Sequence, residues 1–180
     1  MSGAVPAITF EAVTAAHYGL LRRWLAAPHV ARWWGDPEIE FGYIVDMVEG
    51  RDTTQPYVIG ADGMPVGYIQ AWFICDHQNA TWLADNPWLT DLPSDAVGVD
   101  LAIGEADRLG RGIGSAALRL FAERLATEGH RTIVIDPDTD NRRAIATYTR
   151  AGFAPVSHLV GRTGDCLIMQ FGLGARRTAG

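Results

Sequence analysis

A glycine-rich segment, LGRGIG at residues 109–114, has the residue types and spacing that most directly indicate chemistry in this sequence. It lies between an apolar run, residues 97–103, and a long amphipathic stretch that begins at Ile113. Three glycines at alternate positions before a helix let backbone N–H groups approach an anion, and the helix dipole adds positive potential. The segment therefore predicts a phosphate site, although a tight strand-to-helix turn without a ligand gives the same pattern. It matches neither G-x-G-x-x-G nor G-x-x-x-x-G-K-[ST].

A second candidate segment, residues 76–96, mixes acidic and aromatic side chains. It lacks helical or strand periodicity, which predicts a long loop of functional importance. Carboxylates can bind ammonium groups, and tryptophan faces can contact sugar carbons or cations. A polyamine or amino-sugar site is one interpretation, and a solvated loop anchored by two buried tryptophans is the other. The candidates are Asp76, Trp82, Asp85, Trp88, Asp91 and Asp95.

The composition indicates one globular domain over residues 1–180, and its acidic surplus suits a small cationic ligand, although a solvated acidic surface that only aids solubility has the same charge. The net charge is -6, from 21 acidic and 15 basic residues, and every basic residue is arginine. An acidic chain disfavours nucleic acid as a partner, because phosphate backbones require a basic face. No signal sequence or membrane-length apolar run is present in these 180 residues, so we expect a cytoplasmic protein, monomeric or homodimeric, without a membrane partner. Cys75 and Cys166 are expected to be reduced thiols in the core rather than a disulfide, a metal site or a nucleophile.

Hydrophobic periodicity and turn signals predict alternating strands and helices. Thr14 is a candidate N-cap, Pro28 a helix end, and Asp62-Gly63 a hairpin turn. Adjacent Trp33 and Trp34 cannot share one face, so we expect at least one to face solvent, a ligand or another chain, unless a loop covers both. Strands are predicted at 7–13, 57–60, 66–74, 97–103, 132–135, 153–159 and 166–171, helices at 15–26, 39–48, 113–126 and 141–151, and a disordered tail at 172–180.

A second motif, in the C-terminal part, extends the pattern. After Gly112-x-Gly114 the chain reads Asp136-Pro137-x-x-x-Asn141-x-x-Ala144-x-x-x-Tyr148-x-x-x-Gly152-Phe153. In this combination the chain resembles the GNAT family of acetyl-CoA-dependent N-acetyltransferases, over residues 8–171. The resemblance implies a mixed α/β fold with a mostly antiparallel sheet, splayed central parallel strands and flanking helices. It also implies acetyl-CoA (coenzyme A) as the cosubstrate.

Within that family the chain looks most like the aminoglycoside N6'-acetyltransferases, an antibiotic-resistance type that acetylates the 6'-amino group. The resemblance implies direct transfer of the acetyl group, with Asp100 and Asp136 facing the amino sugar. One of these carboxylates is expected to accept the ammonium proton, directly or through water. It places Tyr148 near the coenzyme sulfur as the acid. A backbone N–H around Leu101 or Ala102, on a bulged strand, is the expected oxyanion donor.

The resemblance assigns further residues to the two ligands. One departure is Leu109, which stands where the family usually has Gln or Arg; Arg108 or Arg111 could supply the missing charge. The coenzyme-binding candidates are Leu101, Ala102, Ile103, Arg108, Leu109, Gly110, Arg111, Gly112, Ile113, Gly114, Asn141, Ala144 and Tyr148. The amine-binding candidates are Trp33, Trp34, Trp82, Asp85, Asp100 and Asp136.

Two other functions fit parts of the sequence. The siderophore-biosynthesis branch of the same family acylates hydroxylated lysine-type amines, and it often carries His where this chain has Asp100. A non-catalytic sensor of acyl-CoA would keep the glycine loop, but it would need none of the three candidate catalytic side chains.

Overall fold

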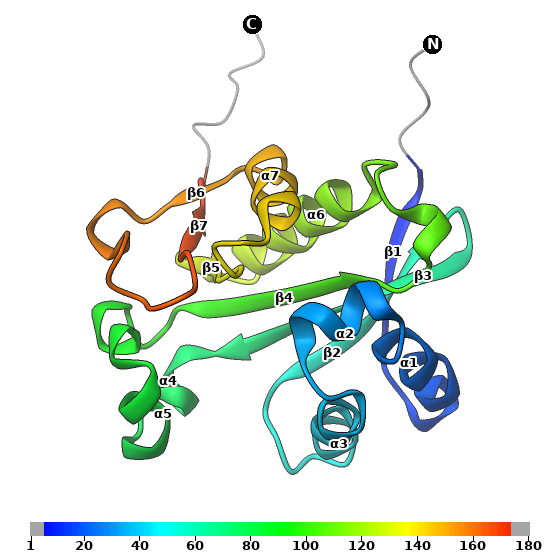
Figure 1. The fold of residues 1–180 in the computed structure, drawn as a ribbon, viewed down its shortest axis with the longest axis horizontal. Coiled ribbons are helices and arrows are strands. Elements are labelled where there is room, and N and C mark those ends of the chain that lie inside the picture. The colour runs from blue at the N-terminus through cyan, green and yellow to red at the C-terminus, as the bar shows by residue number, and fades with distance from the viewer. Residues whose placement is uncertain (1–5, 174–180) are drawn as a thin grey trace, which may run out of the picture.

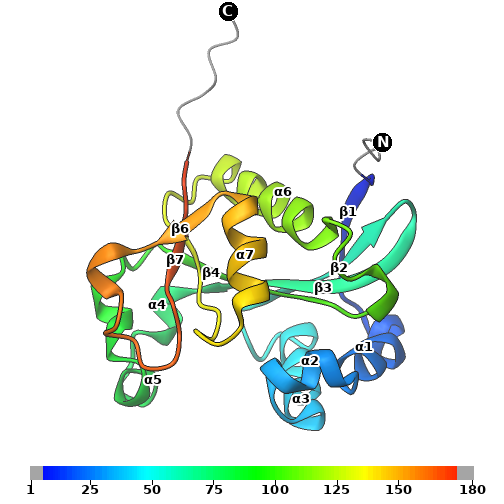
Figure 2. The same cartoon turned by 45° about the horizontal axis from the view of Figure 1, so that its top comes forward.

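The computed structural model describes residues 6–173, which form one seven-stranded sheet with helices on both faces (Figures 1 and 2). The strand order is β1-β2-β3-β4-β5-β7-β6, and every neighbouring pair is antiparallel except β4 and β5. This confirms the predicted fold class. The strands are β1 (Ile8–Ala12), β2 (Gln55–Ala61), β3 (Met64–Phe73), β4 (Val97–Ile103), β5 (Ile133–Ile135), β6 (Phe153–Pro155) and β7 (Met169–Phe171).

The helices divide between the two faces of the sheet, as Figure 2 shows. Three helices cover one face: α1 (Tyr18–Leu25), α2 (Pro28–Trp34) and α3 (Pro37–Val48). Two cover the other: α6 (Ile113–Thr127) and α7 (Arg142–Ala151). The short helices α4 (Ile74–His77) and α5 (Ala80–Asp85) follow β3. No helix within residues 6–173 is long and apolar enough to cross a membrane.

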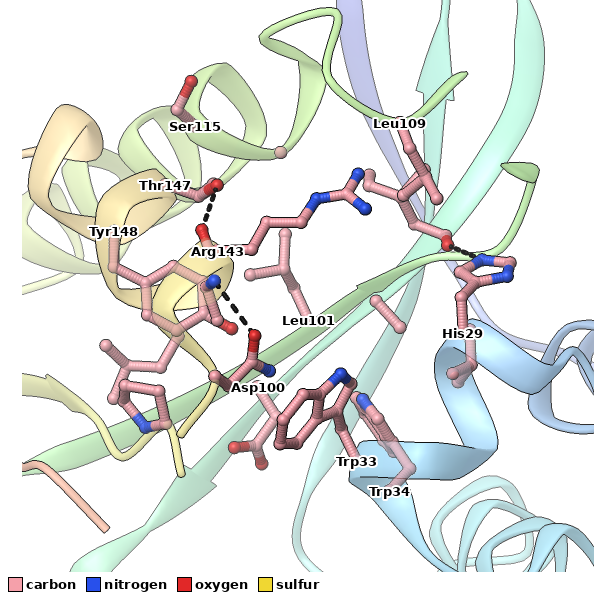
Figure 3. Close-up of a pocket in the computed structure, with 18 of the residues that line it drawn as sticks. His29, Trp33, Trp34, Asp100, Leu101, Leu109, Ser115, Arg143, Thr147 and Tyr148 are labelled. Carbon is pink, nitrogen blue, oxygen red and sulfur yellow. Dashed lines mark hydrogen bonds between the residues drawn. The ribbon is translucent and has the colours of Figure 1, made fainter. Parts of the chain in front are cut away.

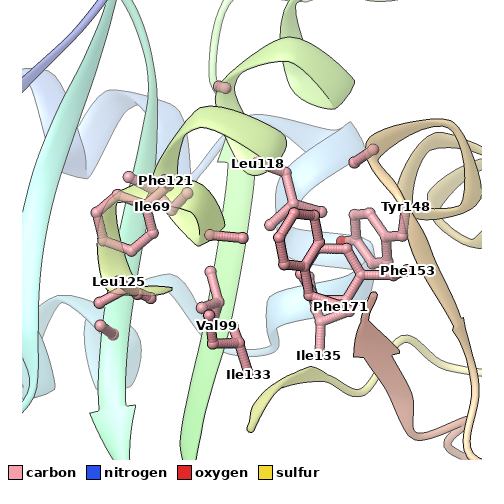
Figure 4. Packing of buried hydrophobic residues seen from close by; sticks show 14 of the residues in the cluster. Ile69, Val99, Leu118, Phe121, Leu125, Ile133, Ile135, Tyr148, Phe153 and Phe171 are labelled. Atoms are coloured by element: carbon pink, nitrogen blue, oxygen red, sulfur yellow. The ribbon is translucent and has the colours of Figure 1, made fainter. Parts of the chain in front are cut away.

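Alternation along the strands builds two separate cores. Ile69 of β3 packs with Val99 and with Phe121 of α6, whereas its neighbour Tyr68 packs with α1 and α3 on the opposite face (Figure 4). Successive strand residues point to opposite faces, so one strand serves both cores. The sheet is therefore fixed from both sides, which holds its central strands in place.

The β2–β3 hairpin forms as predicted. Asp62 and Gly63 both have positive φ, 52° and 78°. These are the signs that a two-residue type I′ turn requires.

One helix was not predicted, and two other predictions are wrong. The first helix ends at Leu25, before Pro28 as expected, but Pro28 is also the first residue of α2, where its fixed φ and missing N–H cost nothing. Cys75 was expected in the core, but it is exposed on α4. Residues 76–96 were expected to form an irregular loop. They instead contain α5 and a 3-10 helix, Pro87–Asp91, and bury Trp88 and Leu89 in a third core. Helices this short contain too few turns for periodicity to reveal them.

The remaining boundaries agree with the sequence to within a few residues, with two exceptions. The closing strands β6 and β7 pair as predicted but are shorter, at three residues each. The bulge expected near Leu101 is absent, because β3 and β4 keep one register from Phe73–Val97 to Gly67–Ile103. Most of the predicted C-terminal tail, residues 174–180, lies outside the described residues.

The parallel strands β4 and β5 separate soon after they meet. Their pairing covers only Val97 with Ile133 and Gly98 with Val134, while β4 continues beside β3 to Ile103. This is the splay that the family resemblance implies. The second half of β4 therefore has an edge toward β5 without a neighbouring strand.

Close contact between β3 and β4 makes Gly67 sensitive to substitution. A Cβ there would collide with the Ala102 carbonyl oxygen and lie 3.1 Å from the Ile103 Cα. We expect Gly67→Ala to lower the free energy of unfolding by about 1–3 kcal/mol, as overpacked sites do. Gly42→Ala, in α3 with open space around it, should raise it by roughly 0.5–1 kcal/mol. Urea denaturation followed by circular dichroism measures both, and equal effects would contradict the steric account.

Candidate active site

A cavity of about 780 Å³ lies where β4 and β5 separate (Figure 3). Its lining combines the second half of β4, the glycine loop, α2 and one side of α7. Most predicted coenzyme residues meet here, while exposed Arg111 and core residue Ile113 do not line the cavity. The predicted residues that line it are Leu101, Ala102, Ile103, Arg108, Leu109, Gly110, Gly112, Gly114, Asn141, Ala144 and Tyr148.

The glycine loop presents main-chain donors to this cavity. Gly110 and Gly112 have φ of 76° and 78°, a conformation that side chains disfavour, and Gly112 is the N-cap of α6. The first N–H groups of a helix have no partners within the helix. Three arginines also line the cavity: Arg108, Arg143 and Arg150. The loop and these charges form a suitable site for a diphosphate, although Leu109 offers no side-chain donor.

The strand register shows which backbone groups of β4 face the gap between β4 and β5. The Val97 N–H donates to Thr132 O on the β5 side, and the Gly104 N–H donates to Val66 O on the β3 side, each at 2.9 Å. Alternation then directs the amides of Leu101 and Ile103 toward the gap and that of Ala102 toward β3. The Nε2–H of His29 donates to the Ile103 carbonyl at 2.9 Å (Figure 3). Leu101 is thus the better-placed main-chain donor of the two that the sequence left open.

A second cavity of about 340 Å³ adjoins the first and differs from it in charge. Four carboxylates and four tryptophans line it, and no arginine does. The two cavities share five lining residues: Trp34, Glu40, Gln70, Asp100 and Asp136. Outside these shared residues, the larger cavity has three arginines and one carboxylate, Asp138, whereas the smaller one has Asp52 and no arginine. The shared carboxylates therefore lie at the junction between an arginine-lined part and an acidic, aromatic part. The residues specific to the anionic side include Asp52, Trp72, His77, Trp82 and Trp88.

Asp100 lies on β4, and its carboxylate accepts a hydrogen bond from a side chain of β3. The Gln70 Nε2–H donates to Asp100 Oδ2 at 2.9 Å, and the Tyr68 hydroxyl donates to Gln70 Oε1 at 2.7 Å. Burial raises the pKa of Asp100, and the Gln70 hydrogen bond opposes that rise. The chain of hydrogen bonds fixes the orientation of the carboxylate.

Asp136 directly follows β5 and titrates together with Asp100. Burial, reinforced by the negative charge of Asp100, raises the pKa of Asp136 to about 8. At neutral pH the carboxyl of Asp136 is therefore mostly protonated. A positively charged amine at the junction would favour loss of that proton.

Tyr148 is buried on α7 and lines the coenzyme-side cavity. Burial, followed by the charges of Asp100 and Asp136, raises the pKa of its phenol above the usual value. The hydroxyl consequently stays protonated at neutral pH and can act as a hydrogen-bond donor.

All of the tryptophan candidates line a cavity, whereas several of the acidic candidates line neither. Trp33 and Trp34 both line the larger cavity; Trp34 packs edge-on against Tyr68, and Trp33 is 37% exposed. Trp82 lines the smaller cavity and is 49% exposed, while Trp88 is buried along its wall. Asp85 and the other acidic candidates of residues 76–96, namely Asp76, Asp91 and Asp95, line neither cavity.

Sequence reasoning missed several lining residues, above all on α3. Glu40, Tyr43, Ile44 and Met47 face the smaller cavity at spacings of three, four and seven residues. That spacing is visible in the predicted helix 39–48, but it does not reveal that this face borders a cavity. His29 and Arg143, which line the larger cavity, were likewise not assigned a role from the sequence.

Comparison with known proteins identifies the class of protein that this fold and site define. The model of the acetyltransferase (GNAT) domain matches residues 13–160. The chain therefore belongs to the GNAT acetyltransferase family, and it is an acyltransferase.

Individual proteins that are similar to this chain include aminoglycoside N6'-acetyltransferases. Aminoglycoside N(6')-acetyltransferase type 1 of Klebsiella pneumoniae is 28% identical over 154 residues, covering 81% of this chain and 73% of that protein. The structure of AAC(6')-Ib with paromomycin and acetyl-CoA has a TM-score of 0.77 and 26% identity, covering 97% of this chain and 98% of the other. The structure of aminoglycoside acetyltransferase AAC(6')-Ib with coenzyme A and kanamycin has a TM-score of 0.73 and 25% identity, covering 91% and 93%.

Gly112 provides a test of the predicted phosphate site. A Cβ there meets nothing within 4 Å, but positive φ makes Gly112→Ala strained, and the methyl group would intrude on an incoming diphosphate. Gly129→Ala, at the other end of α6 with φ of 107°, has the same kind of strain outside both cavities. We expect the Kd for coenzyme A, measured by calorimetry, to rise at least about tenfold in the first variant only. Equal Kd values would argue against phosphate binding at the loop.

The raised pKa of Asp136 predicts a pH-dependent cost in stability. Its folded pKa of about 8 exceeds the unfolded value of roughly 3.9, so the folded state binds more protons between these values, and stability falls as pH rises through them. Asp136→Asn removes this term. We expect the gain in Tm over the unsubstituted protein to grow from pH 5 to pH 9. Asp140→Asn, exposed on the adjacent turn, is the matched control for loss of a carboxyl group. A gain for Asp136→Asn that does not grow with pH contradicts the assignment.

Proposed function

We propose that this protein transfers the acetyl group of acetyl-CoA to the 6'-amino group of an aminoglycoside. One observation carries the proposal: Asp100 and Asp136 line both cavities, one suited to an anionic coenzyme and one to a cationic, ring-containing amine. The similarity to aminoglycoside N(6')-acetyltransferases supports the same substrate class.

The residues present fit the coenzyme. The glycine loop and Arg108, Arg143 and Arg150 suit its phosphates, and the exposed edge of β4 suits the amides of its pantetheine arm. When bound, acetyl-CoA would supply an activated thioester carbonyl to the junction of the cavities. The N–H of Leu101 faces that gap and can donate to the acetyl oxygen as negative charge develops on it.

The carboxylate pair suits both the binding and the deprotonation of the amine. An alkylammonium has no free lone pair at neutral pH, so a base must accept a proton before the nitrogen can attack. Arrival of the ammonium favours the ionised form of Asp136, because it supplies a positive charge beside two buried carboxylates. The carboxylate so formed is the proposed acceptor of the amine proton, while Asp100, held by Gln70, keeps the amine in place.

Tyr148 is proposed to stabilise the leaving thiolate. A thiol has an ordinary pKa near 8.5, below that of a phenol, so complete transfer of the Tyr148 proton to sulfur is unfavourable. A hydrogen bond from the phenol to sulfur is available throughout, because the pKa of Tyr148 is raised. The thiolate can then acquire its proton from the protonated carboxylate pair, or from the attacking nitrogen while it still carries the positive charge that it gains on forming the C–N bond.

Thiol release with acetyl-CoA and kanamycin tests the function directly, with mass spectrometry and NMR locating the acetyl group. Turnover that places it on the 6' nitrogen supports the proposal. Turnover only with hydroxylysine-like amines would favour the siderophore branch. Coenzyme binding without any turnover would favour a sensor.

Replacing Asp136 tests its role. Asp136→Asn should lower kcat at least about 100-fold, the usual contribution of a general base, and coenzyme affinity should not change. The matched variant is Asp140→Asn, which removes the same charge from an exposed position beyond both cavities. Steady-state kinetics should show near-normal turnover for it, and near-normal turnover for Asp136→Asn would exclude the base assignment.

A further inference from the structure

Glu40 is the carboxylate at the cavity junction that no motif assigned. It lies in the first turns of α3, where Asp36 Oδ1 accepts from the backbone N–H groups of Glu38 and Ile39 at 2.9 and 3.2 Å, and Pro37 is the first helical residue. This cap fixes the start of the helix. The face that begins at Glu40 and ends at Met47 then forms one wall of the smaller cavity.

Within residues 6–173 the Glu40 carboxylate has neither a hydrogen bond nor an ion pair, although it is partly buried. Nearby acidic residues are engaged: Glu38 pairs with Arg22 at 3.1 Å, Asp52 Oδ1 accepts from the Thr54 N–H at 2.7 Å, and Asp100 accepts from Gln70. Burial and the charge of Asp100 raise the pKa of Glu40. No arginine lines the smaller cavity, so no arginine there can balance the negative charge of Glu40.

The amine that reacts cannot supply the missing positive charge. That nitrogen must lose its proton, and with it its charge, before it attacks the thioester. A cation that pairs with Glu40 throughout the reaction must therefore be a different group, one that stays protonated. The lining of the smaller cavity, with four tryptophans and four carboxylates, has space and charge for a second ammonium on the same molecule.

We propose that Glu40 is a specificity-determining residue that binds a second ammonium of the acceptor, so that the enzyme selects polyamines over monoamines. This rests on the proposed function and specifies its acceptor side. A charge-assisted hydrogen bond between Glu40 and a second ammonium forms only when the amine substrate carries that second amino group. The residue thus contributes selectivity without taking part in proton transfer.

The test compares acceptors with one and with several amines. Kanamycin carries several amino groups, and methyl 6-amino-6-deoxyglucoside carries one. We expect Glu40→Gln to lower kcat/KM for kanamycin at least about tenfold, mainly through KM, and to change it less than about threefold for the glucoside. Glu40→Asp, which keeps the charge, should retain part of the selectivity. Glu38→Gln on the same helix, outside both cavities, should change neither value.

The other outcomes overturn the inference. Equal losses for both acceptors would mean that Glu40 acts on the reacting amine or on Asp100, and no loss for either would mean that it contacts neither. Unchanged Tm and coenzyme affinity verify that the variant folds. If the unsubstituted enzyme acetylates neither sugar, the proposed function fails; the role of Glu40 is then decided by 1,5-diaminopentane against pentylamine, and failure to acetylate any of the four overturns both.

Discussion

The early separation of two parallel strands is the constraint on which the rest of the site depends. A strand interior normally has both edges hydrogen-bonded, and β4 keeps only its bonds to β3 beyond Gly98. Buried backbone groups without partners are costly, so the exposed edge of β4 needs either solvent or a ligand. An extended chain with amide groups, such as a pantetheine arm, can supply them. Cores on both faces of the sheet hold the strands in this separated arrangement.

The same separation also arranges charge. Asp100 lies on β4 and Asp136 at the end of β5, so the two carboxylates border the opening that the strands create. Arginines and helix N–H groups line the coenzyme side, and carboxylates with tryptophans line the other. The arginines of one side would attract an anionic donor and the carboxylates of the other a cationic acceptor before the two meet. In the proposed reaction, the reacting groups would meet at the shared carboxylates.

Much of the fold could be predicted from sequence because its signals are local. The Asp62-Gly63 turn and the amphipathic helix after Gly112 follow from turn chemistry and periodicity. The helix α2 was missed because a proline can follow the end of one helix and also begin the next, so Pro28 alone does not show that a second helix starts there. Residues 76–96 were misassigned because their helices are shorter than the window in which periodicity is detectable.

The residues of the candidate site likewise divide into those that could be identified from the sequence and those that could not. Asp100, Asp136 and Tyr148 could be named because they belong to motifs with fixed spacing, and the structure brings them to one cavity. Glu40 could not, because its role depends on which face of α3 borders the smaller cavity, a tertiary property. The register of β4 likewise decides between Leu101 and Ala102, since one residue of shift exchanges the two edges of a strand.

Stability and function make opposing demands on this junction. Two carboxylates close together and away from water disfavour ionisation of both, which is why the pKa of Asp136 rises to about 8. An apolar or amide side chain there would cost the folded protein less. A base with that pKa nevertheless suits a task at neutral pH, because it is protonated while the site is empty of cations and ionises when an ammonium arrives. The energetic cost of the empty site therefore becomes, in the complex, part of the attraction for a charged amine.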